Sequence, residues 1–590
     1  MEFIRSASFL CSLFLVSFVT ISEANFNLTI LHTNDEHSRF DEFGPGDFDK
    51  CTQEYQESGE CYGGIARRIS AIKEIRKETG NVILLDAGDR FQGTAWYNYY
   101  RGSQTALFMN NMSYDAIGIG THDFDVDVEG LASFLESLTF PALGCNIDAT
   151  NEPLLDNLIP CSTVLNISGE LVGIVGYTHP ANKEYSRTGN LEIAPVIESL
   201  QEEVDRLTNQ QGVTKIIAVG HAGISIDQEI AQQVEGVDVV VGGRTNTFLY
   251  TGEPPSSEVP YGDYPIVVTP DSNPEGKVLV VSAYRFGKYL GRLDVEFDDQ
   301  GQVQSYNGNP LLLGNHIEKD VGALETLNNF RGPVDELMAS NLAYSMVTLD
   351  GSINTCGRGE CNMGIHFAEA MLNYQLSNES FPGWTQASIA LYNADSFRIS
   401  LPQGYVTYQD VLDVIPYGDT IDVIELRGAD VILVLEVSVT NLEVDGEPSG
   451  GFLQTAGIRI IYDLTKPAGE RVVSVKVLCT ACDIPRYEPI DHDMIYKIVT
   501  NNYIATGGAG YGIIPDMLIS RVKGADDVDV WSDYFRSNSP VWTAVEERVT
   551  FQEDSKCNNG GQYKLNWVVS VFCSALWIGL THRFKALIDI

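Results

Sequence analysis

The polar cluster Thr33-Asn34-Asp35-Glu36-His37 directly follows an apolar run near the start of the chain, and four later clusters repeat this arrangement. The later clusters are Asp86-Ala87-Gly88-Asp89, Gly120-Thr121-His122-Asp123-Phe124-Asp125, Gly220-His221 and Gly242-Gly243-Arg244-Thr245-Asn246. In an open α/β sheet, the carboxyl ends of the strands meet at one crevice, where ligands bind. One Asp or His there is usually a cap or a hydrogen-bonded loop residue. Five clusters in series instead predict a divalent cation site, for zinc, manganese or magnesium.

The runs between these clusters predict an α/β fold. In the segment 63–79, Ile65, Ile69, Ile72 and Ile75 recur at helical spacing, with Arg and Lys on the opposite face. Continuous apolar runs at 82–85, 216–219 and 237–241 are typical of buried strands. A helical stretch at 318–342 leads to a second α/β region, which runs from Tyr344 to about Phe551.

Length and charge exclude several classes of protein. A chain of 590 residues predicts more than one domain, and 44% apolar residues exclude wholesale disorder. The net charge of −42 repels phosphate backbones, so a protein that coats nucleic acid is excluded. An anionic nucleotide remains a ligand wherever a metal or an arginine cluster reverses the local field.

The first 24 residues predict a secretory signal. Arg5 precedes an apolar run at 9–19, and Ser22-Glu23-Ala24 forms a small-x-small cleavage site. A membrane anchor is the alternative, but the run is short for a span. Export predicts an extracellular protein that is secreted or held at the cell surface. Its predicted glycosylation sites are Asn27, Asn111, Asn166 and Asn378.

The cysteines are expected to form disulfides in an exported chain. Short spacings favour the pairs Cys51–Cys61, Cys356–Cys361 and Cys479–Cys482, with Cys145–Cys161 as a weaker fourth pair. Cys479-x-x-Cys482 could also bind zinc, but a second ligand pair is lacking nearby.

The C-terminal tail, 553–590, leaves three interpretations open. A polar spacer precedes an apolar stretch at 565–580, which is typical of a lipid-anchor (GPI) signal. The tail then continues with Arg583 and Lys585, whereas such signals usually end apolar. A short membrane span and an inefficient relic signal are the alternatives.

Four motifs together resemble those of the 5′-nucleotidase/apyrase family. They are Leu31-His32-Thr33-Asn34-Asp35, Leu85-Asp86-Ala87-Gly88-Asp89, Gly220-His221 and Asn362-Met363-Gly364. The resemblance covers nearly the whole chain after the signal, and includes ecto-5′-nucleotidases and salivary apyrases of blood-feeding insects. It implies a calcineurin-like four-layer α/β/β/α metallophosphatase domain at 25–315, a linker helix at 316–343 and an α/β nucleotide-binding domain at 344–552.

The resemblance also implies the roles of site residues. The ligands of one cation match Asp35, His37, the bridging Asp89 and Asn246, and the second cation retains Asp89 and His221. At the two remaining ligand positions, an Asn of the family is Thr121 and a His is Arg244. The catalytic pair matches His122 and Asp125. Arg244 stays protonated and repels a cation, so we expect one divalent ion (zinc, manganese, magnesium or calcium) and a second site that is compromised.

The nucleotide site shows similar departures. Tyr417 and Tyr503 match the two aromatics that sandwich the base, although core packing is their other interpretation, and Asn393 and Arg398 match further nucleotide-binding residues of the family. The glycine loop of the family carries Asp395 here. A family Arg is Gly357, with Arg358 as its neighbour, and the ribose-holding Asp is Ala509.

These departures lead to two hypotheses about function. The favoured one is a secreted or surface protein whose hydrolysis is lost or weakened and which acts by binding, for example to a cell-surface receptor as an inhibitor of platelet aggregation. Arg358-Gly359-Glu360, in the short disulfide loop, loosely approximates an Arg-Gly-Asp triplet, although a plain surface turn is the simpler interpretation. The alternative is an active extracellular 5′-nucleotidase or apyrase that hydrolyses AMP or ADP/ATP. Possession of the fold does not decide between the two.

Overall fold

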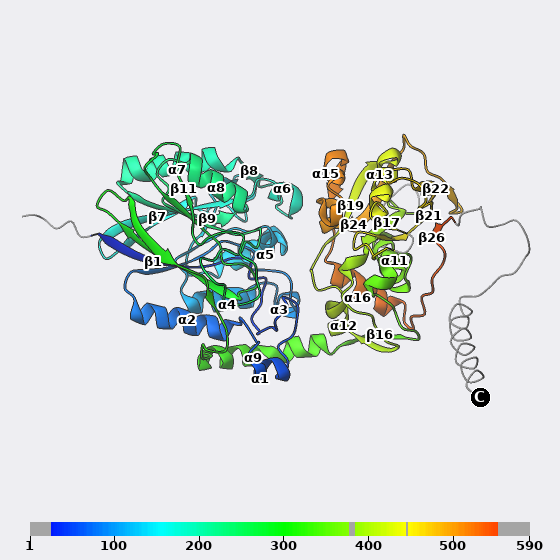
Figure 1. The fold of residues 1–590 in the computed structure, drawn as a ribbon, viewed down its shortest axis with the longest axis horizontal. Helices are drawn as coiled ribbons and strands as arrows, with labels where there is room; N and C mark the ends of the chain where they lie inside the picture. Colours follow the sequence, from blue (N-terminus) through cyan, green and yellow to red (C-terminus); the bar gives the residue numbers. More distant parts are fainter. Residues whose placement is uncertain (1–24, 377–383, 444–445, 553–590) are drawn as a thin grey trace, which may run out of the picture.

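A computed structural model describes residues 25–376, 384–443 and 446–552. They form two lobes, and the long helix α9 (Val321–Met338) runs beneath the N-terminal lobe toward the C-terminal lobe (Figure 1). The predicted signal, the sequon Asn378 and the tail lie outside the described residues. Among the described helices, none has the length and apolar character needed to cross a membrane.

The N-terminal lobe contains two stacked sheets. The first has the order β14-β13-β1-β2-β3-β4, with β15 also paired to β13, and the second has the order β11-β12-β10-β9-β7-β6. The strands of the first sheet are β1 (Phe26–Thr33), β2 (Val82–Asp86), β3 (Ala116–Gly118), β4 (Ala142–Leu143), β13 (Tyr289–Phe297), β14 (Val303–Gly308) and β15 (Leu311–Leu312). Those of the second are β6 (Ser162–Ile167), β7 (Glu170–Thr178), β9 (Lys215–His221), β10 (Val239–Gly242), β11 (Ile266–Val268) and β12 (Val278–Val281).

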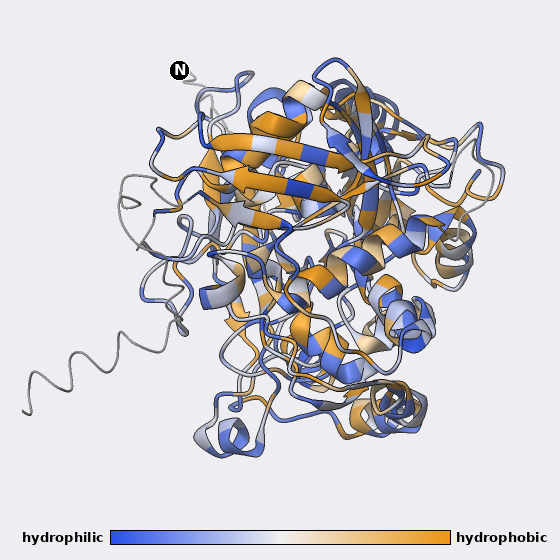
Figure 2. Cartoon of the chain, turned by 90° about the vertical axis from the view of Figure 1, so that its right-hand side faces the viewer, coloured by the Kyte–Doolittle hydropathy of each residue, from blue (hydrophilic) through white to orange (hydrophobic). Residues whose placement is uncertain are grey.

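Helices cover both outer faces of this pair of sheets. The helices of this lobe are α1 (Gln53–Ser58), α2 (Ile65–Glu78), α3 (Ala95–Tyr100), α4 (Ser103–Met112), α5 (Asp127–Glu136), α6 (Asn182–Tyr185), α7 (Val196–Gln211) and α8 (Ile224–Gln233). Of these, α2, α4 and α5 pack on the first sheet, and α7 and α8 pack on the second. Along β1, Ile30 packs between the sheets and Leu31 packs toward α2, as the two-residue period of a strand requires. Figure 2 shows hydrophobic and hydrophilic stretches alternating along helices. The four-layer α/β/β/α arrangement is therefore confirmed.

The C-terminal lobe is a separate α/β body around one core. Its sheets have the orders β20-β17-β24-β19-β25, β23-β22-β21-β26 and β16-β18. The strands are β16 (Asn341–Ser345), β17 (Ile389–Asn393), β18 (Gly404–Thr407), β19 (Ile421–Arg427), β20 (Leu453–Ala456), β21 (Ile458–Tyr462), β22 (Val472–Leu478), β23 (Tyr487–Pro489), β24 (Ile495–Asn501), β25 (Ser520–Val522) and β26 (Val549–Phe551). Its main helices are α11 (Asn362–Leu376), α12 (Tyr408–Val414), α13 (Gly428–Ser438) and α16 (Asp527–Ser537).

All four expected disulfides are present. They join Cys51 to Cys61, Cys145 to Cys161, Cys356 to Cys361 and Cys479 to Cys482. The Cys479–Cys482 bond excludes the zinc interpretation of that motif, because both sulfurs are used.

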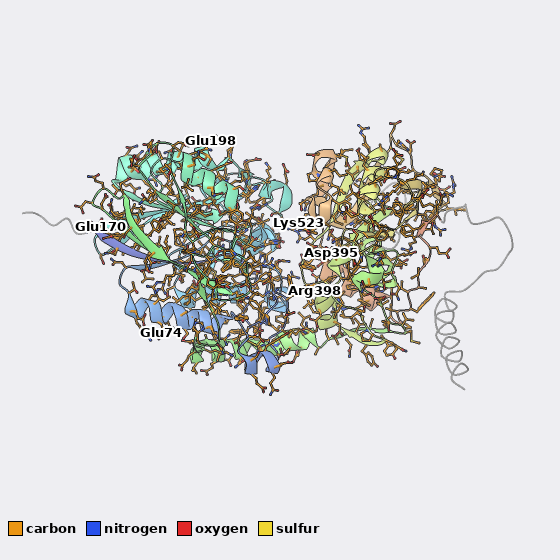
Figure 3. The ribbon with its side chains drawn as sticks, viewed as in Figure 1. Glu74, Glu170, Glu198, Asp395, Arg398 and Lys523 are labelled. Carbon is orange, nitrogen blue, oxygen red and sulfur yellow. A yellow bond between two sulfur atoms is a disulfide. The ribbon has the colours of Figure 1, made fainter. Side chains whose placement is uncertain are left out.

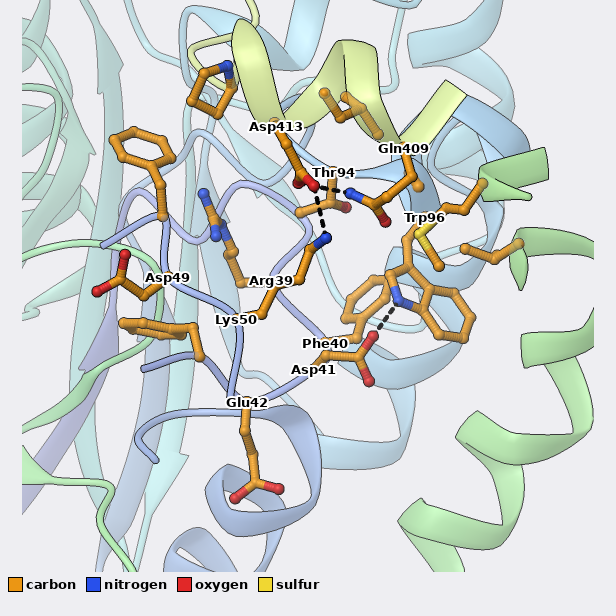
Figure 4. Close-up of a pocket in the computed structure, with 18 residues that line it drawn as sticks. Arg39, Phe40, Asp41, Glu42, Asp49, Lys50, Thr94, Trp96, Gln409 and Asp413 are labelled. Atoms are coloured by element: carbon orange, nitrogen blue, oxygen red, sulfur yellow. Dashed lines mark hydrogen bonds and ion pairs between the residues drawn. The ribbon is translucent and has the colours of Figure 1, made fainter. Parts of the chain in front are cut away.

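The lobes also touch beside α9, around a pocket between the loop 39–50 and α12 (Figure 4). Lys50 Nζ lies 2.8 Å from Asp413 Oδ2, and Asn98 Nδ2 donates to the Tyr408 hydroxyl at 2.8 Å. These contacts hold α12 against the N-terminal lobe next to the carboxyl ends of its strands.

A buried guanidinium ties the ends of β2 and β3 together. Arg90 Nη1 lies 2.5 Å from Asp86 Oδ1, and Arg90 Nη2 lies 2.9 Å from Asp123 Oδ2, with all three side chains inaccessible to solvent or nearly so. Arg90 also donates to the Gly118 carbonyl. Two polar clusters predicted from the sequence are thus held together by one side chain.

We expect Arg90→Met to destabilise the N-terminal lobe by roughly 3–5 kcal/mol, because it leaves two buried carboxylates unpaired. Urea unfolding followed by circular dichroism measures this. Lys77→Met is the matched control, since Lys77 pairs with Glu74 on the surface, and its cost should stay below about 1 kcal/mol. Equal midpoints for the two variants would contradict the role of Arg90.

Candidate metal centre and nucleotide site

The first set of predicted cation ligands converges at the ends of the strands. Donor atoms of Asp35, His37 and Asp89 all lie within 4.8 Å of one another. Asn246 lines the same pocket, and its buried Oδ1 has no hydrogen-bond partner among the described residues. The cluster offers carboxylate, amide and imidazole ligand atoms, and one of them, Asn246 Oδ1, accepts no hydrogen bond from any described residue. Such a set of ligand atoms fits a single divalent cation.

The backbone at this cluster is held in an unusual conformation. Asp35, His37, Asp89, Arg244 and Asn246 have φ values of 51°, 49°, 58°, 82° and 50°. Non-glycine residues with such left-handed values concentrate at functional sites, where the surrounding structure enforces them. The strain re-aims each side chain from the end of its strand into the pocket.

Neighbouring groups set which imidazole nitrogens face the pocket. His37 Nδ1 lies 3.1 Å from Gln92 Oε1, and His221 Nδ1 lies 2.8 Å from the Ala87 carbonyl. Because each of these oxygens accepts, both Nδ1 atoms donate. Nε2 of His37 is left as a ligand atom, whereas Nε2 of His221 faces the Asp89 carboxylate at 2.8 Å.

The carboxylates create the demand for a positive charge. Burial and the nearby Asp89 raise the pKa of Asp35 to about 6, even though His221 opposes the shift. His221 Nε2 lies 2.8 Å from Asp89 Oδ2 and 3.8 Å from Asp35 Oδ1. Burial lowers the pKa of His221, but these two carboxylates outweigh it and raise the value to about 9. A cation beside Asp35 and Asp89 would offset the repulsion between these two buried carboxylates.

The second set of ligands does not assemble for a cation. Arg244 Nη1 donates to Thr121 Oγ1 at 2.5 Å and to Asn182 Oδ1 at 3.0 Å, while Thr121 Oγ1 donates to Asn182 Oδ1 at 2.9 Å. The two departures from the family pattern are therefore hydrogen-bonded to each other. The guanidinium brings its own positive charge to this side of the pocket and offers no lone pair for a metal.

The predicted catalytic pair is in contact. His122 Nδ1 lies 2.7 Å from Asp125 Oδ2, and the carboxylate accepts, so Nδ1 donates. Burial lowers the pKa of His122, but the charges of Asp125 and Asp89 outweigh it and raise the pKa to about 9. The backbone N–H of His122 also donates to Asp89 Oδ1 at 2.7 Å, which fixes the pair beside the cation ligands.

The structure adds pocket residues that the sequence did not reveal: Arg39, Phe48, Gln92, Arg285 and Phe286. Arg39 packs face-on against Phe286, with 4.3 Å from its Cζ to the ring centroid. No hydrogen bond or ion pair of the Arg39 side chain occurs within the described part of the chain. Burial, with repulsion from Arg285, lowers its pKa to about 10, although Asp47 opposes the shift. The pocket therefore holds cationic groups suited to a phosphate.

The two tyrosines predicted to stack on a base are not core residues. Tyr417 is 39% exposed and Tyr503 is 46% exposed. Tyr417 lines the cation pocket, and Gln92 Nε2 donates to its carbonyl at 2.9 Å. Gln92 thereby connects His37 of the N-terminal lobe with a candidate base-binding residue of the other lobe.

The remaining nucleotide-site residues are only partly arranged as expected. Asn393 is buried, and its amide donates to the carboxylate of Asp395, which turns that charge toward a protein partner. Arg398 is exposed, with its Cζ 5.6 Å from the Phe48 ring centroid. Arg358 donates to the Gly446 carbonyl, so it does not replace the arginine missing at Gly357.

The disulfide loop does not present its charged triplet freely. The Glu360 carboxylate accepts from the backbone N–H groups of Glu546 and Arg548. With Arg358 also engaged, the loop is a packed turn, and the loose resemblance to a receptor-binding triplet loses its structural basis.

Comparisons with known proteins agree with this geometry. The pattern of the family described as "Calcineurin-like phosphoesterase" matches residues 28–243, and that of "5'-nucleotidase, C-terminal domain" matches residues 340–516. The chain is 42% identical to the 5′-nucleotidase of Homo sapiens over 539 residues, which are 90% of this chain and 92% of the relative. It is 39% identical to the snake venom 5′-nucleotidase of Naja atra, over 90% of this chain and all of the relative.

Solved structures agree as well. A 5′-nucleotidase precursor from Thermus thermophilus superimposes with a TM-score of 0.62 and 34% identity, over 90% of this chain and 100% of the other. The Haemophilus influenzae NAD nucleotidase, with 24% identity, shares the fold at a TM-score of 0.64, over 90% of this chain and 100% of the other. Family members of the calcineurin-like type depend on divalent metal, which the cluster of Asp35, His37, Asp89 and Asn246 fits. The chain therefore belongs to the 5′-nucleotidase family.

Proposed function

We propose that this chain is an extracellular phosphohydrolase that removes phosphate from adenine nucleotides, such as AMP, at a single divalent cation. The observation that carries the proposal is the convergence of four cation ligands beside the hydrogen-bonded His122–Asp125 pair. Relatives of about 40% identity are named 5′-nucleotidase, which favours hydrolysis over the binding-only function that the sequence departures favoured.

A bound cation would polarise the phosphate and stabilise its developing charge. The residues of the chain supply the rest. Asp125 orients His122, whose Nε2 handles a proton at the reacting phosphate. Arg244, held by Thr121 and Asn182, contributes a fixed positive charge where the family has a second metal. Tyr417 and Tyr503 offer faces for the base.

The replacement of a metal by a guanidinium has a cost. Arg244 can attract a phosphate oxygen, but it cannot lower the pKa of water as a divalent ion does. We therefore expect turnover well below that of relatives with two cations. The same observation favours a second candidate function, a nucleotide-binding protein with negligible hydrolysis.

The exposure of three sequons supports the proposed location and glycosylation. Asn27, Asn111 and Asn166 are all exposed, as glycosylation requires. Together with the signal predicted at 1–24, this supports an extracellular protein that is secreted or held at the cell surface.

Purified protein should release phosphate from AMP, ADP or ATP when zinc, manganese, magnesium or calcium is added, and lose this activity with chelator.

Restoring the family ligands with Thr121→Asn and Arg244→His together should raise kcat by roughly 100-fold, because a second charge-stabilising group is regained. Arg486→His, on the surface, is the control and should change nothing. Wild-type protein that binds nucleotide but releases no phosphate would support the binding-only candidate.

We expect His122→Ala to lower kcat by about 10²–10⁴-fold with little change in KM, because proton handling is lost while binding groups remain. Steady-state phosphate release measures both constants. His492→Ala, an exposed histidine in the other lobe, is the control. A kcat within tenfold of wild type would contradict the role given to His122.

Tyr417→Ala and Tyr503→Ala should each raise KM for AMP by about 5- to 100-fold, since stacking on a base contributes about 1–3 kcal/mol. KM for ribose 5-phosphate, which has no base, should not change. Tyr405→Ala removes an exposed tyrosine of β18 and is the control. Equal effects on both substrates would contradict stacking.

A further inference from the structure

One charged side chain of the C-terminal lobe reaches the catalytic pair of the N-terminal lobe. Lys523 directly follows β25, the edge strand of the five-stranded sheet, and it lies on the side of its lobe that faces the other lobe (Figure 3). Its Nζ lies 2.6 Å from Asp125 Oδ1. The side chains of Lys523 and Asp125 are only 9% and 2% exposed, so this ion pair is largely shielded from water.

The Asp125 carboxylate is shared between two donors. Its Oδ2 receives His122 Nδ1 at 2.7 Å, while its Oδ1 receives Lys523 Nζ at 2.6 Å. Two bonds to different oxygens fix the carboxylate plane, whereas one bond leaves rotation about the Cβ–Cγ axis. Because Nδ1 of His122 is directed at this carboxylate, the plane also sets where Nε2 points in the pocket.

The backbone that carries Lys523 is anchored from both lobes. On its own lobe, the buried Asp422 accepts from Arg521 Nε at 2.7 Å and from the Gly524 backbone N–H at 3.1 Å. From the other lobe, Arg187 Nη2 donates to the Gly524 carbonyl at 2.5 Å. Lys523 is therefore presented by a braced segment and holds its place while the lobes are docked in this arrangement.

We propose that Lys523 is a positioning residue for the nucleotidase reaction: the C-terminal lobe completes the His122–Asp125 pair by holding the second oxygen of Asp125. The inference rests on the proposed function. It makes the orientation of His122 depend on the docking of the lobe that carries Tyr417 and Tyr503. Alignment of the pair and delivery of a nucleotide by that lobe then occur in the same arrangement.

Another contact between the lobes provides a matched control. Arg101 pairs with Asp526 at 3.2 Å and Asp529 at 3.1 Å, so it also holds the C-terminal lobe, and within the described residues no hydrogen bond or ion pair joins it to His122 or Asp125. Removal of Arg101 therefore tests lobe docking alone. Removal of Lys523 tests docking together with the catalytic pair.

Lys523→Met should lower kcat for AMP by roughly 10-fold at nearly constant KM, a fraction of the full effect of proton handling. Lys523→Arg, which keeps the charge, should restore most of kcat, and Arg101→Met should leave kcat near wild type. A kcat for Lys523→Met equal to that of Arg101→Met in an active enzyme would overturn the proposal.

A second readout does not need activity. The low-field proton NMR resonance of His122 Nδ1–H, assigned by its loss in His122→Ala, should shift or broaden in Lys523→Met and persist in Arg101→Met and Lys523→Arg. An unchanged resonance in Lys523→Met would overturn the proposal even in an inactive protein. Absence of hydrolysis with the expected NMR changes would instead refute the proposed function and leave the positioning role standing.

Discussion

The buried carboxylates of Asp35 and Asp89 set the main electrostatic constraint on this molecule. Two negative charges in a site shielded from water are costly unless positive charge is placed beside them. The N-terminal lobe supplies part of that charge through His221 and leaves the remainder to a cation. The left-handed backbone of Asp35, His37 and Asn246, and the Arg90 clamp at the ends of β2 and β3, all serve to hold this arrangement.

On the other side of Asp89, the two ligand positions that depart from the family pattern, Thr121 and Arg244, are in direct contact. Thr121 and Arg244 are hydrogen-bonded to each other and to Asn182. Thr121, which is smaller than the Asn of the family, leaves space for the Arg244 side chain and accepts a hydrogen bond from its guanidinium. In the proposed function, the charge of a second cation is replaced by the charge of Arg244. This preserves positive charge at the pocket and would reduce the ability to activate water.

Much of this could be predicted from the sequence, because the signals were local. The apolar period of 65–75 predicted α2, continuous apolar runs predicted β2, β9 and β10, and polar residues directly after strands predicted the convergence of Asp35, His37 and Asp89. Gln92, Asn182 and Lys523 carried no such signal. Their partners lie far away in sequence: Lys523 meets Asp125 across 398 residues, and Gln92 meets Tyr417 across 325. The contacts of Lys523 and Gln92 depend on how the lobes dock, and those of Asn182 with Thr121 and Arg244 depend on packing within the N-terminal lobe. Hydrophobic period and motif spacing encode neither.

The number of cations in the pocket tests the central claim most directly. Anomalous diffraction from crystals grown with excess zinc would locate each ion. Because Arg244 stands in place of a ligand, we expect one fully occupied ion, bound by Asp35, His37, Asp89 and Asn246. The guanidinium of Arg244 should keep its hydrogen bond to Thr121. Two full peaks, with Asp89 bridging them and Arg244 turned out of the pocket, would contradict it.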